Sequence, residues 1–397
     1  MNTNILNLYN IANKPSRFII GLMSGTSLDG LDVALCRFEG SGIGTKVSLV
    51  EFKTVDYTDD IKLKIKAVFA MQNIDFQHLV LLNEWLGTAH GEMVNACLKA
   101  WGIAARDVDI VASHGQTVFH APQHQHQLSD YPNATLQIGD GDHVAVKTGI
   151  ITLSDFRQKH IAAGGEGAPL AVYGDYLMFS EPGENRIMLN IGGIGNFTYL
   201  PANGDATQVF VSDTGTGNTL MDAFVQQNYG LAYDKDAEIA SKGVVNKLLL
   251  KKLKDNYFFK LPFPKTTGPE LLNLQYLKFA QLATNTSDIA DEDTMATLNR
   301  FSAETIAEAV SSVIQHQVFD IYVSGGGAHN PLLMSLLREL LPNCTFSKTA
   351  DIGIDGDAKE AILFAILANE ALCGGKTEFG NRKSIPSVSM GKISFPN

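Results

Sequence analysis

The chain has 397 residues, of which 45% are hydrophobic and 18% charged, and its formal net charge is −11. This composition is typical of a folded globular protein with two domains and excludes a largely disordered chain. The acidic charge argues against a general nucleic-acid or membrane binder, because both functions need a basic surface.

Other features of the composition limit the class of protein further. The four cysteines form no close pair, so we expect neither a disulfide framework nor a zinc site. No run of 18 apolar residues suggests a transmembrane helix. The first 16 residues are polar and rich in Asn, without the apolar segment of a signal peptide. We therefore expect a cytoplasmic protein with a loose N-terminus.

The first elements in chain order are two apolar strands at 17–22 and 31–38, joined by a turn of small polar residues. Apolar residues at three- and four-residue spacing then predict helices within 60–102. A buried strand at 109–112 is expected to end in a polar turn, SHGQT. The segments ATLQIGDGDHVAVKTG and IITLSDFR predict further strands, the first running into a helix, and the Gly-rich loop AAGGEGAPL follows.

The same order of strand, glycine turn and strand returns in RIMLNIGGIGNFTYL at 186–200. A third glycine turn, in YVSGGGAHNPLLMSLLREL, lies between a predicted strand and a predicted helix. Two similar hairpins so far apart suggest two similar halves. Strands that alternate with helices indicate an α/β architecture.

The turn in the first hairpin has the residues of an anion cradle. We expect Gly25 and Gly30 to permit positive φ and to leave room for a ligand. Ser24, Thr26 and Ser27 can donate hydroxyl hydrogen bonds to phosphate. It is not a Walker A motif, since Leu31 and Asp32 stand where Lys and Ser or Thr would be. The alternative is an ordinary hairpin turn, but three glycine turns suit a nucleotide held between two domains.

Seven motifs together resemble those of the anhydro-N-acetylmuramic acid kinases. They are GLMSGTSLDGLDVAL, ASHGQT, LQIGDG, DFR followed by AAGGEGAPL, LNIGGIGNF, SDTGTGNTLMDAF and VSGGGAHNPLL. The resemblance implies a two-domain actin/hexokinase/Hsp70-like (ribonuclease H-like) α/β fold, with ATP and Mg²⁺ in a cleft between the domains. It also implies a reaction in which water opens the 1,6-anhydro ring of the sugar while O6 is phosphorylated. The product would be N-acetylmuramic acid 6-phosphate, in cell-wall recycling.

The resemblance also assigns roles to residues of this chain. It makes Asp213 the catalytic residue and places Glu360 and Gly165 near the sugar. The residues expected to bind ATP belong to the three glycine turns: Ser24, Gly25, Thr26, Ser27, Leu28, Asp29, Gly30, Leu31, Gly192, Gly193, Asn196, Gly325 and Gly326. Domain I is expected at 17–150, completed by 361–397, and domain II at 151–360. The resemblance further suggests a homodimer.

The residues themselves support a base at Asp213. The segment VFVSD predicts a strand that delivers Asp213 to a glycine turn, where ligand sites of α/β proteins gather. A carboxylate in a dry site can deprotonate the water that attacks the anomeric carbon. The alternative is that Asp213 only caps the following helix. Asp222, within that helix, is expected to be a surface or structural carboxylate, and Asp29 either a turn residue or a Mg²⁺ ligand through water.

Several other polar residues have both a functional and a structural interpretation. His114 and Gln116 could hydrogen-bond the sugar or simply satisfy a turn. Arg157 could neutralise a carboxylate or phosphate of the substrate, or form a structural ion pair with Asp155 or another acid. The loop at 265–268, KTTG, is another candidate for contact with sugar or nucleotide. The histidines of HAPQHQHQL, His120, His124 and His126, fit no standard zinc spacing.

Three residues depart from the pattern of the family that the chain resembles. Thr216 stands where proline is usual, His160 where an acidic residue is usual, and Glu166 where glutamine is usual. The last two leave the exact anhydrosugar open. A kinase of another anhydrosugar, such as levoglucosan, and a non-sugar actin-like ATPase are therefore the alternative functions.

Overall fold

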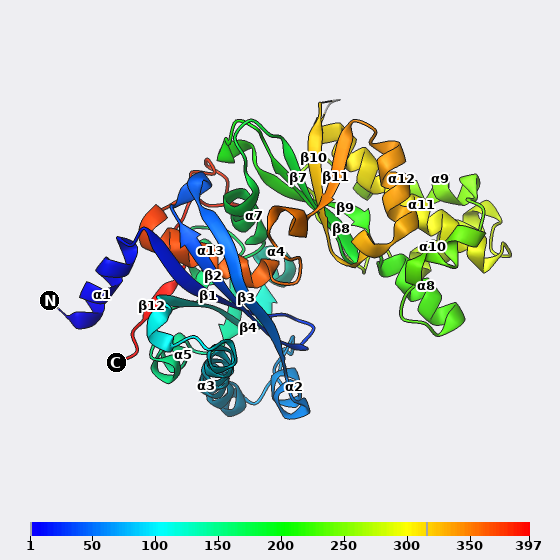
Figure 1. Cartoon of the computed structure of the whole chain (residues 1–397). Helices are drawn as coiled ribbons and strands as arrows, with labels where there is room; N and C mark the ends of the chain where they lie inside the picture. Colours follow the sequence, from blue (N-terminus) through cyan, green and yellow to red (C-terminus); the bar gives the residue numbers. More distant parts are fainter. Residues whose placement is uncertain (1, 315–316) are drawn as a thin grey trace. The chain divides into compact units, whose positions relative to one another are not determined.

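The structure is a computed structural model that describes residues 2–314 and 317–397. It divides into two compact units. The first unit comprises Met1–Phe179 and Gly353–Asn397, and the second comprises Ser180–Ile352. Each unit has a β-sheet with helices packed on it, so the expected α/β architecture is confirmed (Figure 1).

The first unit contains a mixed sheet whose strand order is β12-β6-β4-β1-β2-β3, with β5 paired to β4. The first three strands form an antiparallel meander, β4 runs parallel to β1, and β6 runs parallel to β4. The bounds of its strands are β1 (Ser16–Ser24), β2 (Gly30–Glu39), β3 (Lys46–Asp56), β4 (Ile110–Ala121), β5 (Ala134–Ile138), β6 (Thr152–Ser154) and β12 (Lys392–Ser394).

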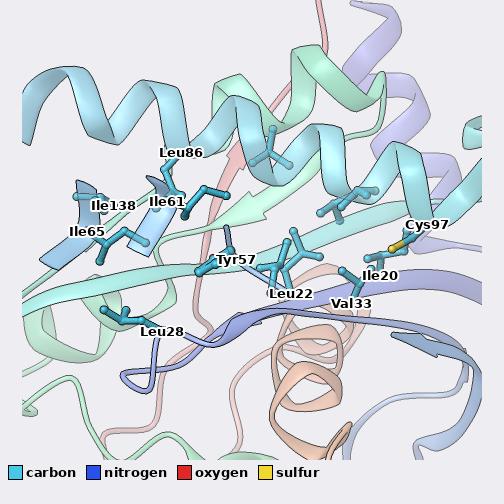
Figure 2. Close-up of a cluster of buried hydrophobic side chains, with 14 of the residues drawn as sticks. Ile20, Leu22, Leu28, Val33, Tyr57, Ile61, Ile65, Leu86, Cys97 and Ile138 are labelled. Carbon is cyan, nitrogen blue, oxygen red and sulfur yellow. The ribbon is translucent and has the colours of Figure 1, made fainter. Parts of the chain in front are cut away.

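Helices cover both faces of this sheet. One face buries Ile20, Leu22 and Val33 against apolar side chains of α2 (Asp59–Lys66) and α3 (Phe76–Trp101), as Figure 2 shows for part of the cluster. On the other face, α13 (Lys359–Asn369) packs directly on β1. A Cβ atom at Gly21 would lie 1.9 Å from the Ala361 carbonyl oxygen, so this close packing requires glycine. The other helices of the unit are α1 (Thr3–Ala12), α4 (Gln123–His126), α5 (Gly141–Thr148), α6 (Phe156–Ala162) and α7 (Ala171–Phe179).

The second unit contains a five-stranded sheet with the order β11-β10-β7-β8-β9. The bounds of its strands are β7 (Arg186–Ile191), β8 (Ile194–Leu200), β9 (Phe210–Thr216), β10 (Phe319–Ser324) and β11 (Cys344–Lys348). One face buries alternate side chains such as Ile187 and Leu189 against α11 (Asp291–Ile314) and α12 (Pro331–Leu340). The helices α8 (Thr219–Tyr229), α9 (Lys247–Lys254) and α10 (Leu274–Thr284) share a second apolar cluster with α11.

Five strands of the first sheet, β6-β4-β1-β2-β3, have the same order and the same directions as the five strands of the second sheet. In each, an antiparallel meander is followed by two parallel strands on the side of its first strand. The prediction of two similar halves is therefore confirmed. This repeated arrangement is the one expected of the actin/hexokinase/Hsp70-like fold.

The structure departs from the sequence-based expectations in several elements. The segment at 151–179 belongs to the first unit, because β6 pairs with β4 and α7 packs against α13. The expected boundary at residue 150 therefore lies too early, and the return at Gly353 precedes the expected position 361. The meander also has a third strand, β3, that the sequence analysis did not identify.

The expectation of a loose N-terminus is wrong. Residues Thr3–Ala12 form α1, whose first turn is capped by the side chain of Asn2. Ile11 is buried, and Asn4 Nδ2 donates to the carbonyl oxygen of Asn397 at 2.8 Å, which ties the helix to the other end of the chain. Among the described residues, no helix combines the length and the apolar composition needed to span a membrane.

Candidate active site

The turn between β1 and β2 has a different backbone from the one expected. Neither Gly25 nor Gly30 has positive φ, and the left-handed residue is Leu28, with φ of 58°. A Cβ atom at Gly30 would lie 2.6 Å from the Val55 carbonyl oxygen, so Gly30 is needed for the close approach of β3. Gly25 is different, because among the described residues its Cβ would approach only Ser27, at 3.4 Å from Oγ and 4.0 Å from the backbone nitrogen. Of the two glycines, Gly25 is therefore the one with space beside it for a ligand.

The hydroxyl of Ser24 belongs to a buried hydrogen-bond network on the interior side of this turn. It donates to Gln116 Oε1 and lies 2.7 Å from the Tyr57 hydroxyl, which in turn lies 2.7 Å from His90 Nε2. Gln116 Nε2 donates to the Gly25 carbonyl at 3.2 Å. Ser24 and Gln116 are 1% and 0% exposed. Their polar groups face the protein interior, whereas Thr26 and Ser27 are exposed.

Asp29 lies exposed at the same turn. Ser27 Oγ donates to Asp29 Oδ1 at 2.6 Å, and the Gly30 amide donates to the same oxygen at 3.1 Å. The hydrogen bond from Ser27 is the main reason that the pKa of Asp29 lies below its ordinary value. The carboxylate is therefore ionised at neutral pH. Among the described residues, no group of three or more His, Cys, Asp or Glu side chains could hold a metal ion directly.

Arg157 and His114 form a second candidate cluster in the first unit. Arg157 Nε donates to His114 Nε2 at 2.9 Å, and Arg157 Nη1 donates to the Gly167 carbonyl at 2.8 Å. Because Nε2 accepts, the proton of this imidazole must be on Nδ1. Burial and the neighbouring guanidinium hold the pKa of His114 well below its ordinary value, so the ring is neutral. Asp155 pairs with Lys392 instead of Arg157, so the expected ion pair between Arg157 and Asp155 is wrong, whereas Glu360 is an acid that interacts with Arg157.

His114 and Gln116 lie within β4, which continues past the expected polar turn to Ala121. A register shift between Leu22 and Ser24 of β1 accompanies the left-handed Gly115, with φ of 74°. The irregularity leaves His114 beside Arg157 and Gln116 beside Ser24. The strand β4 therefore contributes His114 to the cluster around Arg157 and Gln116 to the network around Ser24.

Glu360 is an exposed residue in the first turn of α13, and Arg157 acts on it electrostatically. The surrounding protein removes part of the hydration of this carboxylate, and this desolvation raises its pKa. Arg157 opposes the rise, whereas the carboxylate of Asp32 on β2 adds to it. Glu360 therefore lies close enough to Arg157 for the two groups to interact electrostatically.

In the second unit, the turn between β7 and β8 packs against the start of α8. The amides of Gly217 and Asn218 donate to the carbonyl oxygens of Gly193 and Gly192, at 2.8 and 2.9 Å. A Cβ atom at Gly193 would lie 2.6 Å from Thr219 Oγ1. These contacts fix the turn on the N-terminus of the helix, where the helix dipole favours anions.

The third glycine turn lies beside the same structure. Gly325 has φ of 82°, and a Cβ atom there would lie 2.7 Å from both Asn190 Oδ1 and the Ile191 carbonyl oxygen. At Gly326, a Cβ atom would lie 3.8 Å from Asn218 Nδ2. The structure therefore brings together Gly192, Gly193, Gly325 and Gly326, four of the predicted ATP-binding residues.

A row of polar residues crosses the sheet of the second unit beside these turns. Asp213 on β9 pairs with Asn196 on β8, Asn196 pairs with Asn190 on β7, and Asn190 pairs with Ser324 on β10. Residues paired in this way point to the same face. The apolar neighbours of this row, such as Leu189, pack on α11 and α12, so the polar row lies on the opposite face.

Asp213 is not a helix cap, so the structural alternative for this residue is wrong. It lies inside β9, which continues to Thr216, and the residue at the N-cap position of α8 is Asn218. The Thr267 amide donates to Asp213 Oδ2 at 2.8 Å. Desolvation raises the pKa of the Asp213 carboxyl, and the hydrogen bond from Thr267 lowers it again in part. The result is a half-buried carboxylate with increased basicity.

The chain matches known proteins along most of its length. The family model for anhydro-N-acetylmuramic acid kinase matches residues 17–378. A relative with this name from Pseudoalteromonas atlantica is 60% identical, over 100% of both chains. Another from Caldanaerobacter subterraneus is 37% identical, over 98% of this chain and 99% of the relative. The chain belongs to the anhydro-N-acetylmuramic acid kinase family.

Two solved structures align with the chain at low sequence identity. A Schistosoma mansoni hexokinase complexed with glucose aligns with a TM-score of 0.37 at 11% identity, over 90% of this chain and 86% of that chain. An activator of 2-hydroxyisocaproyl-CoA dehydratase from Clostridium difficile with bound ADPNP has a TM-score of 0.39 at 12% identity, over 89% and 95%. These scores are too low to carry an argument. The fold is therefore identified from the strand order of the two sheets.

The residues at which this kinase departs from the family pattern have structural partners. His160 is fully buried and its Nδ1 accepts from the Gly167 amide at 2.9 Å, while a Cβ atom at Gly165 would lie 2.2 Å from its ring. Glu166 lies 3.3 Å from His124. Thr216 Oγ1 accepts from the amide of Leu220 at 3.4 Å, near the start of α8. These residues shape the loop after α6 and the start of α8.

Some residues of the site escaped the sequence analysis. Tyr57 and His90 complete the hydrogen-bond network at the first turn, although no motif marks them. Thr267 lies in the predicted loop KTTG, but its hydrogen bond to Asp213 was not expected. The side chain of Lys265 lies away from Asp213, because its Nζ donates to the Phe258 carbonyl at 3.1 Å. The basic and hydroxyl-rich loop KTTG was the signal in the sequence for Lys265 and Thr267. Its expected contact with a ligand stays a prediction.

Proposed function

We propose that the protein is an ATP-dependent kinase of 1,6-anhydro-N-acetylmuramic acid. It opens the anhydro ring with water, phosphorylates O6, and yields N-acetylmuramic acid 6-phosphate and ADP for cell-wall recycling. The observation that carries this proposal is the family match over residues 17–378, together with a relative of this name that is 60% identical over the whole chain. Neither alternative from the sequence is favoured by a feature of the structure.

Asp213 is the proposed general base. Water attacks the anomeric carbon, its proton passes to the Asp213 carboxylate, and the bond from the anomeric carbon to O6 breaks. The released O6 then accepts the γ-phosphoryl group of ATP. A raised pKa strengthens the carboxylate as a base, and Thr267 keeps one oxygen fixed so that the other can face the water.

The three glycine turns are the proposed binding sites for the phosphates of ATP. In the first unit the exposed Thr26 and Ser27 can donate hydroxyl hydrogen bonds beside Gly25, whose free side leaves room for phosphate oxygens. Ser24 supports the turn from below through Gln116. In the second unit, Gly192 and Gly326 lie around the start of α8.

Mg²⁺ is the proposed cofactor of the phosphoryl transfer. The residues fit an ion that keeps most of its water, because Asp29 is exposed and ionised and accepts from Ser27 and Gly30 at Oδ1. Asp29 would hold the ion through water at the first turn. When bound, Mg²⁺ neutralises phosphate charge.

The sugar is proposed to bind near Arg157, His114 and Glu360. Arg157 holds the loop after α6 through the Gly167 carbonyl and supplies positive charge for the lactyl carboxylate of the substrate. Neutral His114 fixes the direction of the guanidinium. Glu360 can accept hydrogen bonds from sugar hydroxyls. Gly165 keeps the loop close to His160.

An assay with a panel of sugars tests this function. The protein is incubated with ATP and Mg²⁺ and with either 1,6-anhydro-N-acetylmuramic acid or levoglucosan, and the products are identified by mass spectrometry. We expect a ring-opened 6-phosphosugar from the muramic acid derivative and much less from levoglucosan. A preference for levoglucosan would assign the enzyme to another sugar, and loss of ATP without a phosphosugar would support an ATPase.

We further propose that the enzyme acts in the cytoplasm as a homodimer. Several large apolar side chains along α3 are exposed, among them Phe76 and Leu81, and a dimer could cover them. Light scattering coupled to gel filtration gives the mass in solution. A mass of 43.0 kDa, that of one chain, would contradict the dimer.

A further inference from the structure

The side chain of Lys265 is buried in a cage of aromatic rings. Its Nζ lies 4.6 Å from the ring centroid of Phe258, 5.0 Å from that of Phe263 and 6.0 Å from that of Phe259. It donates to the carbonyl oxygens of Phe258 and Phe259 at 3.1 and 3.3 Å. Lys265 is only 8% exposed. A buried ammonium needs such partners, because desolvation of an unpaired cation is costly.

The backbone of Lys265 is bound to β9 next to the candidate base. The Asp213 amide donates to the Lys265 carbonyl at 2.9 Å, and the Lys265 amide donates to Ser212 Oγ at 3.0 Å. Two residues further on, the Thr267 amide donates to Asp213 Oδ2. Among the described residues, this amide is the one hydrogen-bond donor to the Asp213 carboxylate. The segment thus reaches the carboxylate through Thr267 and is held in place at Lys265.

A second contact joins the aromatic cage to the same strand. Gly215 in β9 has φ of 135°, and a Cβ atom there would lie 3.0 Å from the Phe259 ring. The Phe259 ring also packs edge-to-face on Phe301 of α11, with the centroids 5.6 Å apart. The cage is therefore part of the core of the second unit. The ammonium of Lys265 connects this part of the core to residues 265–267.

We propose that Lys265 is a positioning residue, which anchors the segment 265–267 so that the Thr267 amide holds the Asp213 carboxylate. The proposal rests on the function proposed above, in which Asp213 is the base. Lys265 acts through Thr267 and touches no reacting atom. Without its ammonium the cage no longer binds the segment, and the hydrogen bond to Asp213 lengthens or breaks.

Three variants test the proposal. Lys265→Met keeps an unbranched chain but removes the charge, Lys265→Arg keeps a cation that can donate to both carbonyls, and Lys260→Met is the matched control. Lys260 follows Phe259 of the cage in the chain, but its side chain is 72% exposed and pairs with Asp255. We expect Lys265→Met to lower kcat about tenfold or more with little change in the KM for ATP, since small displacements of a catalytic group are costly. Lys265→Arg should restore most of this loss, and Lys260→Met should behave as the wild type.

The pH dependence separates positioning from a purely structural role. A hydrogen bond to the charged carboxylate lowers its pKa, so loss of the Thr267 bond must move the acid limb of the kcat profile to higher pH. The same upward shift should appear in a carbon-13 NMR titration of the Asp213 carboxyl, assigned with Asp213→Asn. If Lys265→Met lowers the melting temperature but leaves both titrations unchanged, Lys265 is only structural and the proposal is overturned.

Two further measurements keep the outcomes distinct. If Lys265→Met does not fold, Phe263→Leu removes one ring of the cage while it keeps an apolar side chain, and it should give a smaller shift in the same direction. An unchanged Asp213 titration in Phe263→Leu would then overturn the proposal. The NMR titration needs no substrate. If the wild type fails to phosphorylate the sugar, the proposed function fails, and the hydrogen bond at Asp213 is still tested.

Discussion

Asp213 and Asn196 lie directly opposite each other on β9 and β8, just after a register shift between these two strands. The two side chains therefore point to the same face of the sheet, together with Asn190 and Ser324. This face is the one that α11 and α12 leave uncovered. Within this row the carboxylate of Asp213 lies among neutral polar groups and its pKa is raised by desolvation, which suits a general base.

Replacement of Asp213 by Asn should abolish most of the phosphorylation of the sugar. The amide has the same shape but cannot accept the proton of water, so kcat should fall by about 10²–10⁴-fold. Calorimetry should show nearly unchanged binding of ATP. The control is Asp222→Asn, because Asp222 is another half-buried carboxylate and burial raises its pKa to about 6. An active Asp213→Asn enzyme together with an inactive Asp222→Asn enzyme would move the base to α8.

The activity should depend on pH through the ionisation of Asp213. Burial raises the pKa of this carboxyl, so the enzyme should lose activity on acidification at a pH above the ordinary range of an aspartate. Activity is present above this pKa and is lost as the pH falls through it. A profile of kcat against pH gives the pH at which this activity is lost on the acid side. An acid limb that persists in the residual activity of Asp213→Asn would mean that another group titrates.

Gly25 and Gly30 should respond differently to substitution. Gly25→Val should leave the melting temperature almost unchanged, because among the described residues only Ser27 lies near the new Cβ atom. Its branched side chain would fill the space beside the turn, so the affinity for ATP should fall about tenfold or more, which corresponds to about 1.4 kcal/mol. Calorimetry with ATP measures the loss, and unchanged affinity would make this turn purely structural.

Gly30→Ala is the matched comparison within the same turn. Its Cβ atom would clash with the Val55 carbonyl, so β3 must shift and the melting temperature should fall. A stable Gly30→Ala protein would contradict the assigned packing of β3 on β2.

The buried network beneath the first turn should make the stability of the fold sensitive to acid. Burial lowers the pKa of His90 to about 4, against 6.5 for a free imidazole. Between these values the unfolded chain binds a proton that the folded chain does not, so stability is full above pH 6.5 and falls as the pH drops toward 4. From pH 7.5 to pH 5, His90 alone should cost about 2 kcal/mol.

Urea denaturation of the wild type and of His90→Gln measures this contribution. The variant can still hydrogen-bond Tyr57 but cannot take up a proton, so its stability should depend less on pH. His160 also has a pKa lowered to about 4, and some acid sensitivity should remain in the variant. An identical pH dependence in both proteins would mean that His90 does not contribute.

Local sequence patterns predicted the elements whose structure depends mainly on residues that are close in the sequence. Both hairpins, the α/β class and the glycine turns follow from apolar runs that are separated by Gly and small polar residues. The pattern missed β3, whose residues are largely exposed, because edge strands of this kind lack a continuous apolar face. It also missed α1, whose helix is held by Asn397 from the other end of the chain.

The candidate site was predicted in its residues but only partly in its contacts. Asp213 and the glycine turns stand in recognisable motifs, whereas their partners come from distant segments. Thr267 reaches Asp213 from 54 positions along the chain, and Gln116 reaches Ser24 from 92 positions away. Such contacts arise from the tertiary packing of the sheets. A single sequence contains no local signal for them.

The most direct test of the proposed reaction is the fate of oxygen from water. The enzyme is incubated with ATP, Mg²⁺ and 1,6-anhydro-N-acetylmuramic acid in water enriched in oxygen-18, and the product is analysed within minutes by mass spectrometry. A control incubation of unlabelled product corrects for exchange at the anomeric carbon. If water opens the ring with Asp213 as the base, the sugar gains one heavy oxygen and its phosphate group gains none. Heavy oxygen in free phosphate, with no labelled phosphosugar, would contradict the account and indicate hydrolysis of ATP alone.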